Sequence, residues 1–203
     1  PMTTTNKTIA IGQVLFRWRS LTPVPVILLL GAVLWLERAR WVDGDGTRAL
    51  GFFAAGLAVA LLGQALRAWV LGQVPEGTSG QGFSLEASTL NTNGPYARVR
   101  NPLYVGNLGI VVGLLLMTQS LLASAIALAF FFGEYHFIIR AEENFLRGQF
   151  GERFDEFCRK VPRWLPRLTA ATDLPLSHRF DWRRALKKEH NPFTAWVTGA
   201  LAI

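Results

Sequence analysis

The sequence is poor in residues that cross-link small proteins or bind metals. Cys158 is the only cysteine in 203 residues, so the chain has no internal disulfide and no cysteine-based metal site. The three histidines, His136, His178 and His190, stand far apart, which argues against a zinc site. Charged residues make up only 17% of the chain and are nearly absent from several long stretches. We therefore expect no metal site and look to the apolar stretches for the fold.

The apolar residues form long blocks instead of following amphipathic spacing. A bilayer core requires about 20 consecutive apolar residues for a helix that spans it. Four blocks approach or reach this length and a fifth, weaker one ends the chain: 21–36, 49–74, 103–117, 121–139 and 192–203. A buried core helix remains an equal alternative for the fifth block. We predict an all-α polytopic integral membrane protein with about four to five transmembrane helices.

The distribution of charge predicts an orientation in the membrane. Lys7, Arg17 and Arg19 precede the first block with no acidic residue among them. After the fourth block come twelve Lys and Arg against eight Asp and Glu. The positive-inside rule then places the N-terminus, the segment between the second and third blocks, and the long tail in the cytoplasm. The net charge of +7 suits anionic lipid head groups, whereas nucleic-acid binding is disfavoured because acids are interleaved with the bases.

The stretch 94–107, with the sequence GPYARVRNPLYVGN, predicts the start of the third membrane helix. Pro102 suits the first helical position and Asn101 suits the N-cap. The free backbone N–H groups of such a helix start can hold a carboxylate or a phosphate. Arg98 and Arg100 add positive charge beside it. An anion site at the cytoplasmic surface is therefore one interpretation of this stretch.

Small and polar residues follow inside the same helix. Tyr104 and Asn107 lie three positions apart and share a face. Gly106, Gly109 and Gly113 remove side-chain bulk, and the last two have the spacing of a close helix contact. The plainer interpretation is a capped helix with packing glycines and an interfacial tyrosine, and the residues alone leave both open.

A second polar motif lies at the end of the fourth block. Glu134 stands inside an apolar helix, where an ionisable group is costly and usually faces a cavity or a partner. His136, Arg140 and Glu143 follow helical spacing and form one polar stripe. A salt-bridged helix end leaving the membrane would explain Arg140 and Glu143, but it leaves Glu134 without a reason.

A third motif covers residues 150–166. Phe150, Phe154 and Phe157 repeat at helical spacing with charges opposite, which predicts an amphipathic helix that anchors the chain to the membrane surface. Prolines end this helix after Cys158, for which we expect a structural role.

In this order, the three motifs resemble those of the isoprenylcysteine carboxyl methyltransferase and phospholipid methyltransferase superfamily of integral membrane enzymes. The resemblance rests on an Arg-Asn-Pro-x-Tyr-x-Gly stretch, a Glu-Glu-x-x-Leu stretch, a Phe-Gly start to a helix and a Val-Pro-Arg ending, at 100–106, 142–146, 150–157 and 161–166. Many members have histidine where Asn101 stands. This departure argues against a mechanism that needs an imidazole at that position.

The resemblance implies an S-adenosylmethionine-dependent methyltransferase with its cofactor at the cytoplasmic mouth and a lipid or other hydrophobic acceptor entering from the bilayer. The cofactor-binding residues that it implies are Arg100, Asn101, Pro102, Tyr104, Gly106, Glu142 and Glu143. Tyr104 would face the sulfonium, and Glu142 or Glu143 would bind ribose hydroxyls or balance the positive charge. We expect Glu134 or His136 to orient or deprotonate the acceptor.

The apolar blocks and the three motifs also predict the domain boundaries and the cellular location, and they leave two alternative functions open. We expect one membrane domain over 1–203, divided into an N-terminal helical pair at 21–74, a catalytic core at 75–166 and a C-terminal segment with a partial apolar helix at 167–203. The expected location is the inner membrane of a bacterium. Two alternatives remain open: an NADPH-dependent membrane reductase of the sterol type, and a lipid-binding membrane protein without enzymatic activity.

Overall fold

The computed structural model describes residues 4–38, 46–74, 85, 87–171 and 180–201, and no strand occurs among them. The helices are α1 (Thr4–Trp18), α2 (Pro23–Glu37), α4 (Gly46–Gln73), the short 3-10 helix η1 (Gly94–Ala97), α5 (Pro102–Thr118), α6 (Leu121–Phe150), α7 (Glu152–Lys160) and α8 (Trp182–Leu201). The predicted all-α architecture is confirmed.

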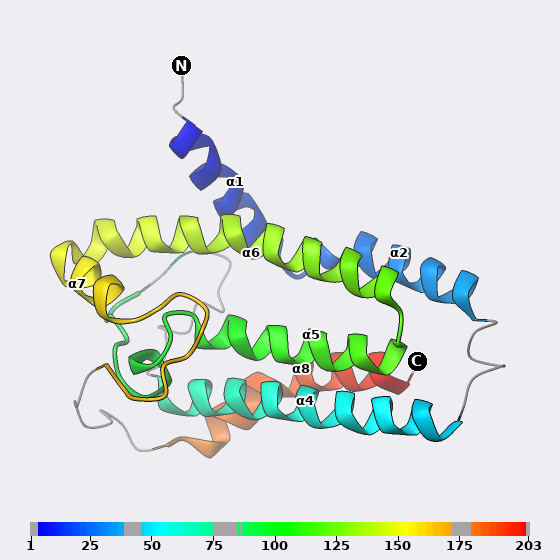
Figure 1. Cartoon of the computed structure of the whole chain (residues 1–203). Helices are drawn as coiled ribbons and strands as arrows, with labels where there is room; N and C mark the ends of the chain where they lie inside the picture. Colours follow the sequence, from blue (N-terminus) through cyan, green and yellow to red (C-terminus); the bar gives the residue numbers. More distant parts are fainter. Residues whose placement is uncertain (1–3, 39–45, 75–84, 86, 172–179, 202–203) are drawn as a thin grey trace.

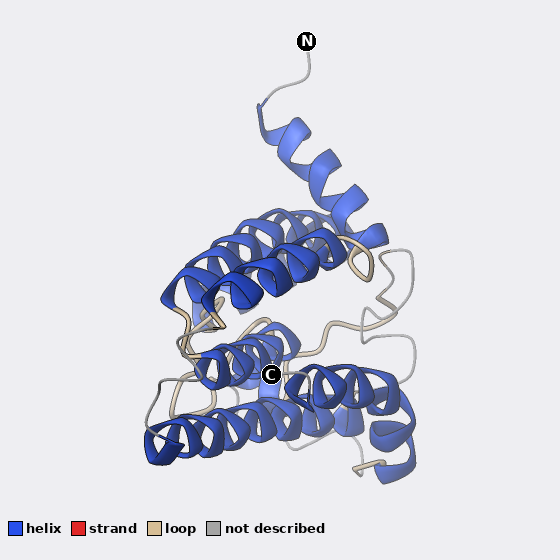
Figure 2. Ribbon diagram, turned by 90° about the vertical axis from the view of Figure 1, so that its right-hand side faces the viewer, coloured by secondary structure: helices blue, strands red, loops and turns tan. Residues whose placement is uncertain are grey.

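The long helices form two groups that lie one above the other (Figure 1). In the first group α1 and α2 pack along α6, and in the second α4 packs against α5 and α8. Figure 2 shows the same two groups from the side, with the N-terminal part of α1 projecting beyond them. A tight turn joins the groups, since Gln119 has the left-handed φ of 51° and Ser120 Oγ accepts a hydrogen bond from Ala123 N at the start of α6.

Glycines let α4 and α5 approach until their backbones touch. A Cβ at Gly113 of α5 would lie 2.5 Å from the carbonyl oxygen of Gly56 in α4. A Cβ at Gly63 of α4 would lie 2.6 Å from the carbonyl oxygen of Gly106. The close helix contact predicted from Gly109 and Gly113 is therefore present, and its partner is α4.

The first prediction concerns this contact. Gly113→Ala should destabilise the protein by about 1–3 kcal/mol, because its new methyl group meets backbone atoms that cannot move without separating the helices. Thermal unfolding in detergent measures the effect. Gly133→Ala is the matched control, since nothing lies within 4 Å of a Cβ there. Equal melting temperatures for the two variants would contradict the close contact.

Fewer helices than predicted are long and apolar enough to cross a membrane. Among the described residues these are α4 and α6, and α1 with α2 makes a third if this pair, bent by 74°, forms one span. The expectation of four to five spans was too high for three reasons: α2 has only 15 residues, α5 has 17, and the last apolar block shares α8 with the charged residues of its first half. Large exposed leucines such as Leu28 and Leu62, each 71% exposed, suit contact with lipid.

Candidate functional site

A cavity of about 500 Å³ lies where residue 85 with residues 87–100 (the 85–100 segment), the start of α5 and the second half of α6 meet. The break between α1 and α2 supplies Arg19 and Ser20 to its wall, and α8 supplies Lys188. The predicted site residues that line it are Arg100, Asn101, Tyr104, Glu142 and Glu143. Phe154 and Phe157 of the third motif line it as well, so one cavity collects residues from all three sequence motifs.

The carboxylate of Glu143 joins the three motifs. Arg100 Nη1 donates to Glu143 Oε1 at 2.9 Å, and Arg163 donates through Nε at 3.0 Å and through Nη2 at 2.5 Å. The backbone N–H of Arg100 donates to the carbonyl of Pro162 at 2.9 Å, which ties the 161–166 segment to the start of α5. Glu143 is 9% exposed, so these charge-assisted hydrogen bonds act largely out of water.

Arg100 has a buried donor without a partner among the described residues. Its Nη1 also contacts Cys158 Sγ at 3.0 Å, but its Nε is buried and has no hydrogen-bond partner in the described part of the chain. Burial raises the pKa of the Cys158 thiol, and the charge of Arg100 opposes this shift. The thiol therefore stays neutral, in line with the structural role expected for it. A buried N–H without a partner is costly, so a ligand that accepts from Arg100 would be favoured.

Two tyrosines and a glutamate form a second group in the cavity. Tyr104 Oη donates to Glu142 Oε1 at 2.7 Å, and the Tyr104 and Tyr135 rings lie 4.5 Å apart. Tyr96 of η1 also lines the cavity, and burial together with the Glu142 charge raises its pKa. A raised pKa keeps this phenol protonated at neutral pH.

A buried polar network lies under the same cavity. Arg67 of α4 forms a salt bridge with Glu189 of α8 at 2.7 Å and donates to Asn107 of α5. Asn107 in turn donates to Tyr135 Oη of α6 at 2.7 Å. Of these residues, only Asn107 was predicted to share a helix face with a site residue. Arg67 could have been found as a charge inside an apolar block, whereas nothing in the sequence pairs it with Glu189.

Asn101, Pro102 and Gly106 have structural neighbours that the sequence did not show. Pro102 is the first residue of α5, as predicted, but Asn101 makes no capping bond and donates through Nδ2 to Arg163 O at 3.1 Å. Gly106 faces α4, where a Cβ would lie 2.6 Å from Arg67 Cγ. Its lack of a side chain thus makes room for Arg67. Cofactor contacts at these three positions stay predictions.

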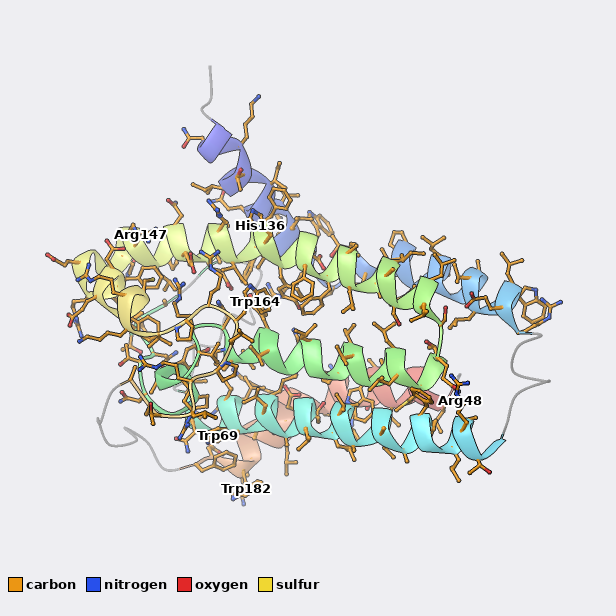
Figure 3. The ribbon with its side chains drawn as sticks, viewed as in Figure 1. Arg48, Trp69, His136, Arg147, Trp164 and Trp182 are labelled. Atoms are coloured by element: carbon orange, nitrogen blue, oxygen red, sulfur yellow. The ribbon has the colours of Figure 1, made fainter. Side chains whose placement is uncertain are left out.

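The structure does not bring Glu134 or His136 to the cavity. Glu134 is 7% exposed and accepts a hydrogen bond from the hydroxyl of Thr22, next to the start of α2. His136 is exposed and its ring lies edge-on to that of Phe137 (Figure 3). Neither residue lines the cavity. Their roles toward an acceptor stay predictions.

The prediction of a membrane-surface anchor at residues 150–166 was wrong for its central phenylalanines. Phe154 is 2% exposed and Phe157 is 7% exposed. They form a core cluster with Val161, against which Leu90 and Tyr96 pack. The apolar face of α7 is therefore covered by the 85–100 segment, and α7 serves as a wall of the cavity.

Two curated proteins are similar to the chain over part of its length. The chain is similar to a cobalt-zinc-cadmium resistance protein, CzcN, of Cupriavidus metallidurans, with 44% identity over 82 residues, which is 40% of this chain and 38% of that protein. It is also similar to a nickel-cobalt-cadmium resistance protein, NccN, of Alcaligenes xylosoxydans xylosoxydans, with 44% identity over 85 residues, 41% of this chain and 39% of that protein. The chain thus matches about two fifths of the length of these curated relatives. No solved structure matches the chain.

A sequence model of the phospholipid methyltransferase family matches residues 52–153. This stretch comprises most of α4, all of α5 and α6 and the start of α7. It holds Arg100, Tyr104, Glu142 and Glu143. The match covers half of the chain, so the chain belongs to the phospholipid methyltransferase family.

Proposed function

We propose that the protein transfers a methyl group from S-adenosylmethionine to a lipid or other hydrophobic acceptor at the cytoplasmic face of a bacterial inner membrane. The observation that carries this proposal is the Glu143 carboxylate held between Arg100 and Arg163, beside a cavity into which three motifs project. Family membership supports the reaction class, and the lipid-facing helices support a hydrophobic acceptor.

The residues present fit the cofactor. A cavity of about 500 Å³ is large enough for a molecule of its size. The buried Nε of Arg100, which has no partner in the described part of the chain, suits a carboxylate such as that of the methionine part. Glu142 and Glu143 offer carboxylate oxygens to ribose hydroxyls, and the Tyr104 ring offers an aromatic face to a cation. When bound, the cofactor supplies an electrophilic methyl group.

The protein's own contribution is to position the two reactants. Methyl transfer is an in-line displacement, so holding the acceptor in line with the methyl group provides much of the rate increase. Aromatic rings continue from the cavity toward the lipid-facing side of α6. Trp164 lies 6.5 Å from Tyr135 and 5.6 Å from the half-exposed Phe132, measured between ring centroids. An apolar acceptor chain would lie along these rings.

The names of the two relatives suggest a biological process in which this chain could act. Both are called metal-resistance proteins. Among the described residues, no group of three or more His, Cys, Asp and Glu could hold a metal ion. We therefore propose that this chain contributes to metal resistance, if it does so, by modifying a membrane component. A metal-challenge growth assay of a deletion strain tests this role.

Calorimetric titration of the detergent-purified protein with S-adenosylhomocysteine tests the cofactor. We expect micromolar binding, which corresponds to about 8 kcal/mol of binding free energy. A parallel titration with NADPH is the control and should show no heat of binding. Binding of NADPH without binding of S-adenosylhomocysteine would overturn the proposal in favour of a reductase.

A further inference from the structure

Helix α8 lies outside the residues that the family model matches, yet it is fastened to the cavity through a buried carboxylate. Glu189 is 5% exposed and accepts from Arg67 through Nη2 at 2.7 Å and through Nε at 3.0 Å. Gln64 donates to the same carboxylate, and Trp196 Nε1 donates to Gln64 Oε1 at 2.8 Å. Two donors of the Arg67 guanidinium are therefore held by α8.

The remaining contact of Arg67 fixes the orientation of an amide. Arg67 Nη1 donates to Asn107. Because a guanidinium has donors and no acceptor, Asn107 must present its oxygen to Arg67 and its nitrogen to Tyr135. Asn107 Nδ2 therefore donates to Tyr135 Oη at 2.7 Å, and the tyrosine oxygen acts as acceptor.

Tyr135 is left with a proton to donate. Tyr135 lines the cavity, and no described residue accepts a hydrogen bond from its hydroxyl. Its neighbour Tyr104 has the opposite role, because the Tyr104 hydroxyl donates to Glu142 and keeps its lone pairs. The two rings lie 4.5 Å apart, so the cavity offers one phenol that donates beside one that accepts.

We propose that Tyr135 binds the methyl acceptor by donating a hydrogen bond to an oxygen of its polar group, and that Glu189 is a positioning residue that sets this role through Arg67 and Asn107. This inference rests on the proposed function and adds the chemistry of the acceptor. Its polar group carries an oxygen with free lone pairs, other than the atom that is methylated. An acceptor whose only polar group is an ammonium does not satisfy Tyr135.

A matched pair of amphiphiles tests the inference on the full chain in detergent, with S-adenosylhomocysteine present. Oleate offers carboxylate oxygens, whereas oleylamine has the same chain and offers only donors. The readout is the infrared C–O stretch of ring-labelled tyrosine, which distinguishes a phenol that accepts from one that donates. The chain has only three tyrosines, so the difference from Tyr135→Phe isolates the band of Tyr135. We expect oleate to shift this band and oleylamine to leave it unchanged.

Asn107→Asp separates the proposed role from a structural one. An aspartate at this position still accepts a hydrogen bond from Arg67, but it cannot donate one to Tyr135. The Tyr135 hydroxyl then donates its hydrogen bond to the aspartate and is no longer available as a donor to the ligand. We expect oleate to bind at least about tenfold more weakly to Asn107→Asp and to Tyr135→Phe, with a much smaller change for S-adenosylhomocysteine. Glu156→Gln on the exposed side of α7 is the control and should bind oleate like the wild type.

The outcomes distinguish this inference from the proposed function. A Tyr135 band that oleate and oleylamine affect equally, or that neither affects, overturns the inference. Wild-type oleate affinity in Asn107→Asp overturns it as well. Failure of the wild-type protein to bind S-adenosylhomocysteine overturns the proposed function, while the Tyr135 band still reports whether the phenol donates to an added oxygen.

Discussion

Glu143→Ala should lower the affinity for S-adenosylhomocysteine by about a hundredfold or more, since hydrogen bonds to charged groups each contribute about 1.5–3 kcal/mol. The carboxylate receives two arginines, and alanine would leave both guanidinium groups without their anion. The same change removes the contact that holds the 161–166 segment against α6. Calorimetric titration in detergent measures the loss of affinity.

Two variants make this result specific. Glu156→Ala removes an exposed carboxylate that pairs with Lys160, and it should leave binding unchanged. Glu143→Gln keeps the shape of the side chain and one acceptor oxygen, so its affinity should lie between those of alanine and the wild type. Wild-type affinity in Glu143→Ala would exclude the Arg100–Glu143–Arg163 cluster from the cofactor site.

The motif residues around Glu143 could be predicted because they are consecutive or lie within a few turns of one another. Arg100, Asn101 and Tyr104 follow from one helix start, and Glu142 with Glu143 from another short stretch. The structure places these five residues around one cavity. The type of fold was also predictable, since blocks of apolar residues with few charges require helices in a membrane.

Residues that act through distant partners could not be predicted. Arg67 and Glu189 are 122 positions apart, and no local spacing reports such a pair. Tyr135 lies next to Glu134, but only the rotation of α6 decides which of the two faces the cavity. That rotation depends on packing against α1 and α2, which helical periodicity cannot supply.

Packing between segments also explains the two errors in the fold. The apolar face of α7 suited either a membrane surface or a protein core, and only the path of the 85–100 segment decides for the core. The number of spans was overestimated because an apolar block can lie on a helix too short to cross a membrane. The blocks 21–36 and 103–117 lie on α2 and α5, which have only 15 and 17 residues.

Glu189→Ala should lower the free energy of unfolding by about 3–5 kcal/mol, the usual cost of leaving a buried charge without its partner. The side chains of Arg67 and Glu189 are only 10% and 6% exposed, so the charge of Arg67 would be left largely buried. Thermal unfolding in detergent should show a large fall in melting temperature. Thr198→Ala on the exposed side of the same helix is the control, since its hydroxyl bonds only to the helix backbone.

The double variant Arg67→Met with Glu189→Leu should recover most of this loss, because well-packed apolar residues can replace a buried ion pair without destabilising the fold. The double variant should still bind oleate weakly. Arg67 would no longer orient Asn107, so Tyr135 would lose its fixed role as hydrogen-bond donor. A double variant as unstable as Glu189→Ala would mean that Gln64 and Trp196 also depend on the carboxylate. Recovery of stability without recovery of binding would instead show that α8 can pack onto α4 without the buried ion pair. The Arg67–Glu189 pair would then serve to orient the Tyr135 phenol in the cavity.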